Sequence, residues 1–262
     1  MRSDLKALFE RHYLIRLWLW YRIRVRYSQT FLGILWVVAF PLLTSLVYAF
    51  AIGEILGAKM LVDVPYVPFI LAGQLVYTIF SSVLLGARGT FLSVMGLSNQ
   101  IYFPREIVLI IILGEALVDF FFGFLAMLLI NRYFGVIPTP MLLFTLYPLL
   151  VLCSLTLALS FFLSWYAIRI RDLQPLLTIV IQLLFFLTPI FYNTSAVPIQ
   201  YRFIVYLNPL TPIVEAFRSA VLGSKIPTNL RGLHASFIVA LLLLILGYRF
   251  FKKREKRLMD YQ

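Results

Sequence analysis

Six long runs of uncharged or nearly uncharged residues constrain what this 262-residue chain can fold into. They extend over residues 31–53, 68–92, 107–130, 141–168, 173–192 and 233–251. Each run is close to the roughly 20 residues that an α-helix needs to cross the hydrocarbon core of a bilayer, or exceeds it. A helix is also the only open-ended element whose backbone hydrogen bonds are all satisfied in lipid. We therefore predict an all-α integral membrane protein with six transmembrane helices.

Basic residues predict the orientation of these spans. The chain is 62% hydrophobic and 13% charged, and its 23 Lys and Arg outnumber its 11 Asp and Glu. If the N-terminus lies inside, 17 basic residues fall on the cytoplasmic side and 6 on the outer side. That bias predicts cytoplasmic N- and C-termini. It also explains the net charge of +12 as a topology signal, so no nucleic-acid partner is expected.

The segments outside the spans predict one transmembrane domain over residues 1–262 rather than separate domains. Residues 1–30 read as a cytoplasmic interfacial amphipathic helix, in which Arg22, Arg24 and Arg26 form a basic collar that faces lipid headgroups. Spans one to five occupy residues 31–192, span six occupies 233–251, and 252–262 form a basic cytoplasmic tail.

The segment 193–232, between the last two spans, contains four prolines and predicts short re-entrant or interfacial helices on the outer side. Within it, Thr211 followed by Pro212 is a favourable helix start, with the Thr side chain as its cap.

The sequence lacks the motifs of nucleotide hydrolysis and of metal catalysis. No Gly-Lys dipeptide occurs, which excludes a P-loop for ATP. The two histidines, His12 and His234, are far apart, and no Cys/His cluster has the spacing of a metal site. We therefore predict no catalytic residue, no metal site and no cofactor in this chain.

Three charges lie well inside predicted spans, away from the basic end of span six at Arg249: Arg88, Glu115 and Asp119. Glu115 and Asp119 are four residues apart, so they share one face of their helix. Ionised groups in a membrane are costly and often functional, which leaves a proton relay or a polar patch in a channel as interpretations. The structural alternative is a buried ion pair between Arg88 and Glu115.

Aromatic residues occur inside the spans as well as at their ends. Aromatic rings can stack on sugars without selecting one sugar, as they do on bases, whereas an interfacial belt is the simpler interpretation. Five aromatic residues share helices with polar or kinking residues, namely Trp36, Phe40, Phe185, Phe186 and Tyr192.

Four stretches resemble the membrane subunit of ABC-2 type polysaccharide exporters, the group of O-antigen, capsule and teichoic acid permeases. They are RYSQTFLGILWVVAFPLL (26–43), NQIYFPREIVL (99–109), RDLQPLLTIVIQLLFFLTPIFY (171–192) and LNPLTPIVEAFR (207–218). The resemblance implies a homodimer in the bacterial cytoplasmic membrane, with two soluble ATPase subunits that bind ATP and Mg. It also implies a lipid-linked glycan substrate on an undecaprenyl carrier.

The resemblance further implies roles for individual residues. The first and fifth spans would line the substrate path with Trp36, Phe40, Tyr48, Gln182, Phe185, Phe186 and Tyr192. The cytoplasmic loops would contact the ATPase subunit through Gln100, Tyr102, Phe103, Arg105, Glu106, Arg171 and Asp172.

Other functions remain open at this point. An ABC-2 exporter of a drug or a lipid would share the architecture. A membrane-embedded glycan- or lipid-processing enzyme would need a cluster of acids or histidines at one membrane face, and a secondary transporter would depend on Asp119 alone.

Overall fold

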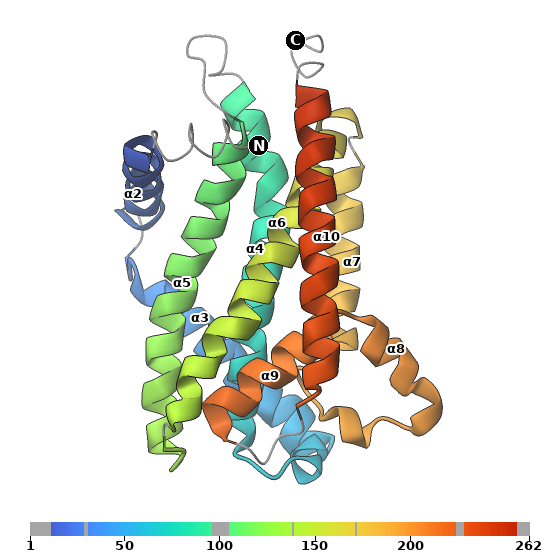
Figure 1. Ribbon diagram of the computed structural model, residues 1–262. Coiled ribbons are helices and arrows are strands. Elements are labelled where there is room, and N and C mark those ends of the chain that lie inside the picture. Colours follow the sequence, from blue (N-terminus) through green and yellow to red (C-terminus); the bar gives the residue numbers. More distant parts are fainter. Residues whose placement is uncertain are drawn as a thin grey trace.

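The computed structural model describes residues 12–28, 31–95, 105–137, 139–170, 172–223 and 228–255, and within these ranges it contains helices and no strand (Figure 1). The helices are α2 (His12–Ser28), α3 (Leu35–Tyr48), α4 (Tyr66–Met95), α5 (Glu106–Tyr133), α6 (Leu146–Arg169), α7 (Leu173–Leu187), α8 (Arg202–Leu207), α9 (Leu210–Leu222) and α10 (Leu230–Glu255). The predicted all-α fold is confirmed.

In the described part of the chain, five helical segments are long and apolar enough to cross a membrane. They are Leu35–Ile55, Tyr66–Ala87, Glu106–Tyr133, Pro140–Tyr166 and Leu230–Arg254. The first continues α3 through a π-helical stretch, Ala49–Ile55, and the fourth enters α6 through a 3-10 turn, Pro140–Thr145. These segments match predicted spans one to four and six. The chain is a multi-pass membrane protein.

The fifth predicted span, 173–192, is a shorter helix than expected. Helix α7 has 15 residues and ends at Leu187, so at 1.5 Å per residue it is about 22 Å long. The hydrocarbon core is roughly 30 Å thick. The helix ends there because Pro189 has no N–H to donate and forces the preceding residue out of the helical region. Thr188 accordingly has an extended backbone, with ψ of 137°.

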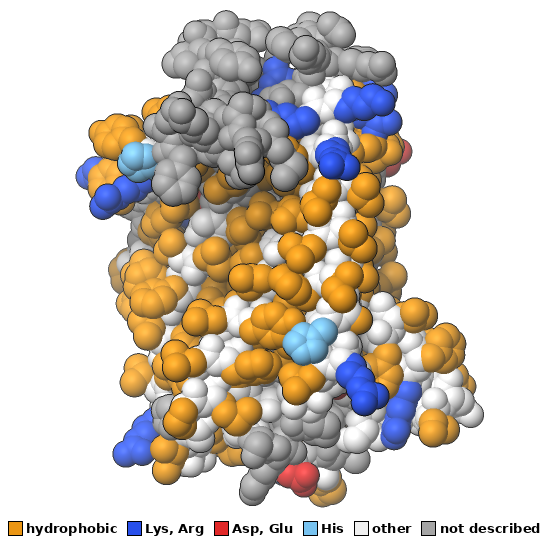
Figure 2. Space-filling model, in the orientation of Figure 1, with side chains coloured by type: hydrophobic (Ala, Val, Ile, Leu, Met, Phe, Trp, Pro, Cys, Tyr) orange, Lys and Arg blue, Asp and Glu red, His pale blue; other side chains and the backbone are white. Residues whose placement is uncertain are grey.

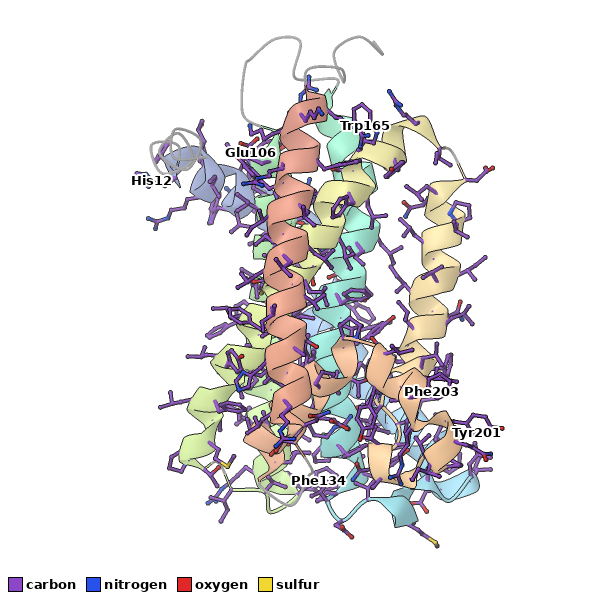
Figure 3. All side chains as sticks on the ribbon, turned by 45° about the vertical axis from the view of Figure 1, so that its right-hand side comes forward. His12, Glu106, Phe134, Trp165, Tyr201 and Phe203 are labelled. Atoms are coloured by element: carbon purple, nitrogen blue, oxygen red, sulfur yellow. The ribbon has the colours of Figure 1, made fainter. Side chains whose placement is uncertain are left out.

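The two ends of the bundle differ in what they contain. Figure 3 shows Glu106 and Trp165 near one end, which we call the Trp165 end, and Phe134, Tyr201 and Phe203 near the other, the Phe134 end. Helix α2 and the last turn of α10 both lie toward the Trp165 end (Figure 1). Hydrophobic side chains cover the middle of the face seen in Figure 2, and Lys and Arg side chains lie toward its two ends.

The core is built around α4 and α9. All 13 residues of α9 are buried, and α9 crosses the bundle toward the Phe134 end, against α4, α6 and α10 (Figure 1). Helix α10 packs along α6. A Cβ at Gly247 would lie 2.8 Å from the carbonyl oxygen of Ala158, so only glycine permits this close approach of α10 to α6.

The start of α9 differs from the predicted Thr211 cap. The backbone N–H of Leu210 donates to Oδ1 of Asn208 at 3.0 Å, while the Thr211 hydroxyl donates to the carbonyl of Val205 at 2.6 Å. The predicted cap is therefore wrong. Helix α9 begins at Leu210, before Thr211, with Pro209 as its N-cap residue, so the Thr211 side chain lies inside the first turn and cannot cap it.

Candidate functional site

The two acids in the middle of α5, Glu115 and Asp119, are paired with arginines of α2. Arg22 forms an ion pair with Glu115, and Arg26 Nη1 lies 2.8 Å from Asp119 Oδ2. Both pairs are matched in spacing, because four residues separate the arginines on α2 and four separate the acids on α5. The two pairs therefore join α2 to α5 over one turn of each helix.

These pairs bear on two expectations, the partner of Glu115 and the orientation of the arginines of α2. Glu115 has Arg22 as its partner, and the side chain of Arg88, the predicted partner, lies outside the described residues. Arg22 and Arg26 of the predicted basic collar pair with acids of α5, and the contact of the collar with lipid headgroups stays a prediction. The cause of the pairing is electrostatic, since a carboxylate in an apolar bundle is stabilised most by a nearby guanidinium.

Asp119 has a second partner, Tyr27, whose hydroxyl donates to Oδ1 at 2.6 Å. Burial and this hydrogen bond raise the pKa of the Tyr27 phenol well above its ordinary value, so Tyr27 donates as a neutral phenol. Both oxygens of Asp119 therefore accept a hydrogen bond from α2.

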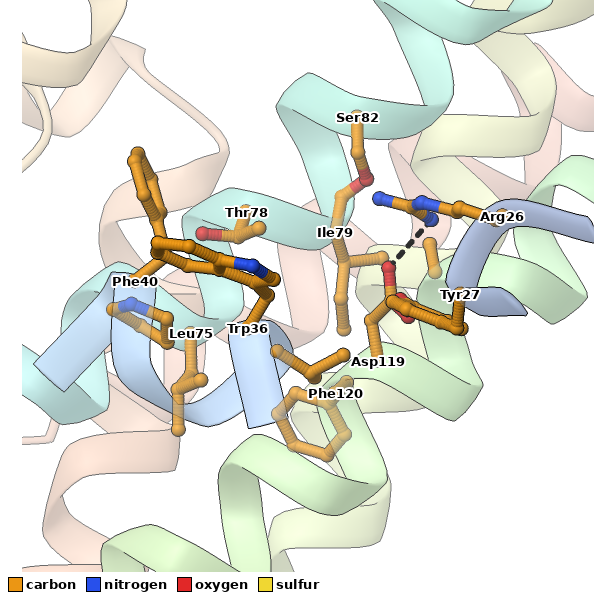
Figure 4. Close-up of a pocket in the computed structure, with 13 residues that line it drawn as sticks. Arg26, Tyr27, Trp36, Phe40, Leu75, Thr78, Ile79, Ser82, Asp119 and Phe120 are labelled. Carbon is orange, nitrogen blue, oxygen red and sulfur yellow. Dashed lines mark hydrogen bonds and ion pairs between the residues drawn. The ribbon is translucent and has the colours of Figure 1, made fainter. Parts of the chain in front are cut away.

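The Arg26–Asp119 pair lies at the edge of a cavity of about 460 Å³ (Figure 4). Residues of α2, α3, α4 and α5 line it: Arg26, Tyr27, Trp36, Val37, Phe40, Pro41, Leu75, Thr78, Ile79, Ser82, Ala116, Asp119 and Phe120. Its volume falls in the range of small-molecule sites, which are mostly apolar with a few placed polar groups. The cavity has that character, with Thr78, Ser82 and the ion pair as its polar groups.

Predicted path residues are divided among three places. Trp36 and Phe40 line the cavity. Tyr48, Phe185 and Phe186 form a separate aromatic cluster with Phe191, in which the Tyr48 and Phe191 ring centroids are 5.0 Å apart.

The remaining two path residues lie on or near α7. Gln182 is exposed on α7. Tyr192 donates to the carbonyl of Leu187 at 2.9 Å and lines a smaller apolar pocket of about 380 Å³. The cavity therefore brings together two of the three path residues of the first span, and none of those of the fifth.

The predicted ATPase contacts are only partly described. Gln100, Tyr102, Phe103 and Arg171 lie outside the described residues. Arg105 and Glu106 are buried, and Glu106 Oε1 forms an ion pair with Lys252 Nζ at 2.8 Å. Asp172 is exposed just before α7. The contact itself stays a prediction.

Sequence reasoning did not assign a role to Arg218, which is fully enclosed by the fold. Its Nη2 donates to the carbonyls of Pro189 and Ile190 at 2.9 and 3.1 Å, and its Cζ lies 3.5 Å from the centroid of the Phe69 ring. These carbonyls follow the end of α7, where no helical N–H is available. The available signal was a pair of opposite charges, Glu215 and Arg218, on a mostly apolar helix that begins near Thr211-Pro212.

Comparison with known proteins places this architecture in a family. Residues 13–222 match the model of the ABC-2 type transporter family. The chain belongs to the ABC-2 type transporter family. The matched region extends from α2 to the end of α9, so it includes both Arg–acid pairs, the cavity and Arg218.

Several ABC-2 relatives are named for polysaccharide transport. The chain is 25% identical over 242 residues to an O-antigen export system permease protein RfbA of Klebsiella pneumoniae, covering 91% of this chain and 90% of the relative. It is 26% identical over 243 residues to RfbA of Myxococcus xanthus, covering 91% of each. It is 27% identical over 241 residues to the polysialic acid transport protein KpsM of Escherichia coli, covering 90% and 92%.

Proposed function

We propose that this chain is the membrane-spanning subunit of an ATP-driven exporter that moves a lipid-linked polysaccharide across the bacterial cytoplasmic membrane. The observation that carries the proposal is its similarity, over about nine-tenths of its length, to permeases named for O-antigen and polysialic acid transport. The glycan would travel on an undecaprenyl carrier, and the termini would be cytoplasmic.

A separate subunit would supply the energy. The chain has no P-loop sequence, so ATP and Mg would bind to two copies of a soluble ATPase subunit. The exposed residue Asp172, at the Trp165 end near the start of α7, is a described candidate for that contact.

A second copy of the chain would complete the pathway. Helices α3 and α7 carry large apolar side chains that the fold leaves exposed, including Phe40, Val47, Leu183 and Phe186. In a homodimer these faces would meet lipid or the partner subunit, and the residues predicted to line the path lie on or next to them.

Export in cells tests this proposal. Deletion of the gene for this chain should abolish a surface polysaccharide, and the intact chain should restore it. Phe40→Ala should reduce export, because it removes an aromatic wall of the cavity. Phe50→Ala is the matched control, since Phe50 is equally exposed on the same span but lines a different pocket. Unchanged surface polysaccharide together with increased drug sensitivity in the deletion strain would favour a drug exporter instead.

A further inference from the structure

The cavity between α2 and α5 has balanced charge. Among its described lining residues only Arg26 and Asp119 are charged at neutral pH, and they neutralise each other at 2.8 Å. An anionic ligand would meet a carboxylate and no surplus cation, and burying an uncompensated charge is costly. The charge balance therefore favours a neutral ligand.

The polar groups of the cavity retain hydrogen-bonding capacity. Arg26 has five N–H donors, and the Arg26 contact with Asp119 involves Nη1. The Thr78 and Ser82 hydroxyls donate to carbonyls of their own helix, those of Gln74 at 2.8 Å and Ile79 at 3.3 Å. Their oxygen lone pairs stay available as acceptors. Donors and acceptors thus remain available in the cavity for the neighbouring hydroxyls of a sugar.

The aromatic rings that line the cavity fit the apolar face of a sugar ring. In the view of Figure 4, the Trp36 ring lies between Phe40 and the Arg26–Asp119 pair. A flat aromatic ring can stack on an apolar ligand face without selecting its polar edge. A pyranose has both features, an apolar C–H face and a polar rim of hydroxyls.

We propose that this cavity binds a neutral pyranose unit of the transported glycan. Arg26 and Asp119 hydrogen-bond its hydroxyls, and Trp36 stacks on its ring. The inference rests on the proposed function and adds a substrate class to it, neutral rather than acidic sugar. It also makes α2 part of the binding site rather than a membrane anchor alone.

The chain offers a matched control for this proposal. Arg22 and Glu115 form an ion pair between the same two helices, one turn away, and neither residue lines the cavity. The double change Arg22→Gln with Glu115→Gln therefore removes the same kind of α2–α5 contact as Arg26→Gln with Asp119→Asn. Only the second double change removes groups that would touch the sugar.

The experiment uses the whole exporter, this chain with its ATPase subunit, in lipid nanodiscs. ATP hydrolysis is measured against the concentration of two polyprenyl-linked oligosaccharides of equal length, one of neutral hexoses and one of hexuronic acids. The neutral glycan should half-saturate at the lower concentration. Arg26→Gln with Asp119→Asn should raise that concentration about tenfold, the effect of losing a charge-assisted hydrogen bond. Arg22→Gln with Glu115→Gln should change it by no more than about twofold.

The possible outcomes separate the two claims, the substrate class and the proposed function. Equal shifts from the two double changes, or a preference for the acidic glycan, would overturn the inference and leave the proposed function standing. No stimulation of the unmodified exporter by either glycan would contradict the proposed function itself.

Ser82→Ala is a second test, for the case in which the Arg26–Asp119 double variant does not fold. Ser82 is an exposed residue on the cavity wall, so its replacement should not disturb folding. It should raise the half-saturating concentration of the neutral glycan about threefold, and no change would also overturn the inference.

Discussion

Two spans of nearly equal length and apolar character, Leu35–Ile55 and Tyr66–Ala87, have opposite positions in the fold. The first has 21 residues and the second 22, but in an 18-residue apolar window of each, 6% of the residues of the first are buried within the chain and 72% of those of the second. The second carries small and polar residues that permit contacts inside the bundle, such as Gly73 and Tyr77. The first presents large apolar side chains outward. Similar hydropathy therefore does not distinguish a central helix from a peripheral one.

The difference in burial between the two spans shows which of them depends on contacts with lipid or another subunit. A peripheral apolar span is stable only against lipid or another subunit, since water would solvate it poorly. The central span needs only the rest of its own chain. Substitutions in the central span should therefore lower the free energy of unfolding more than substitutions in the peripheral span. Substitutions in the peripheral span should be detected by a measurement of subunit association.

The largest effect is expected from Gly73→Val in the central span. A Cβ at Gly73 would lie 2.6 Å from Nη2 of Arg218 and 3.4 Å from Cα of Ile190, so the larger side chain would displace both. We expect a loss of about 3 kcal/mol in the free energy of unfolding, measured by denaturant titration in mixed micelles. Val47→Leu in the peripheral span is the control, and an equal loss there would contradict the comparison.

Arg218→Met should have the next largest effect. It removes the donor to the carbonyls of Pro189 and Ile190, and it removes the positive charge that interacts with Glu215, a buried acid on the same helix. We expect a loss of about 2 kcal/mol by the same titration. Unchanged stability would mean that water or backbone rearrangement satisfies the broken end of α7.

The α2–α5 ion pairs should contribute less, because they are partly solvated. In a double-mutant cycle of Arg22→Gln and Glu115→Gln, we expect a coupling energy of about 1 kcal/mol. The side chains of Arg22 and Glu115 are 28% and 12% exposed, which reduces the value expected for a buried pair. A coupling near zero would show that α2 is held to α5 by apolar packing.

The smallest effect on stability is expected from Val47→Ala in the peripheral span. Val47 is 63% exposed, so the free energy of unfolding of the monomer should change by less than about 0.5 kcal/mol. If a second copy covers α3, the same change should weaken dimerisation, measured by single-molecule subunit counting in bilayers. A large loss of monomer stability would show that α3 is not peripheral.

Local pattern was enough to predict several features of the fold and the site. Uncharged runs located five long spans, and the spacing of Glu115 and Asp119 placed both acids on one face of α5. The end of α7 could also have been predicted from the sequence, because Pro189 interrupts a helix. The resemblance selected Trp36 and Phe40 as path residues before their cavity was known, and their role in transport remains to be tested.

Contacts between distant segments could not be obtained in this way. Arg22 lies 93 residues from Glu115, and nothing in either segment distinguishes it from Arg24 or Arg26 as a partner. Likewise, no local pattern links Arg218 to carbonyls 28 and 29 residues earlier.

The sequence by itself determined that the chain spans a membrane, because the cost of burying charge and unpaired backbone in lipid depends on each segment alone. Only the tertiary structure decided which span is central, which arginine neutralises which acid, and which aromatic rings share a cavity. Those outcomes depend on the relative positions of whole helices, and packing against several neighbours at once fixes these positions. Hydropathy, a property of one segment, carries no information about its neighbours.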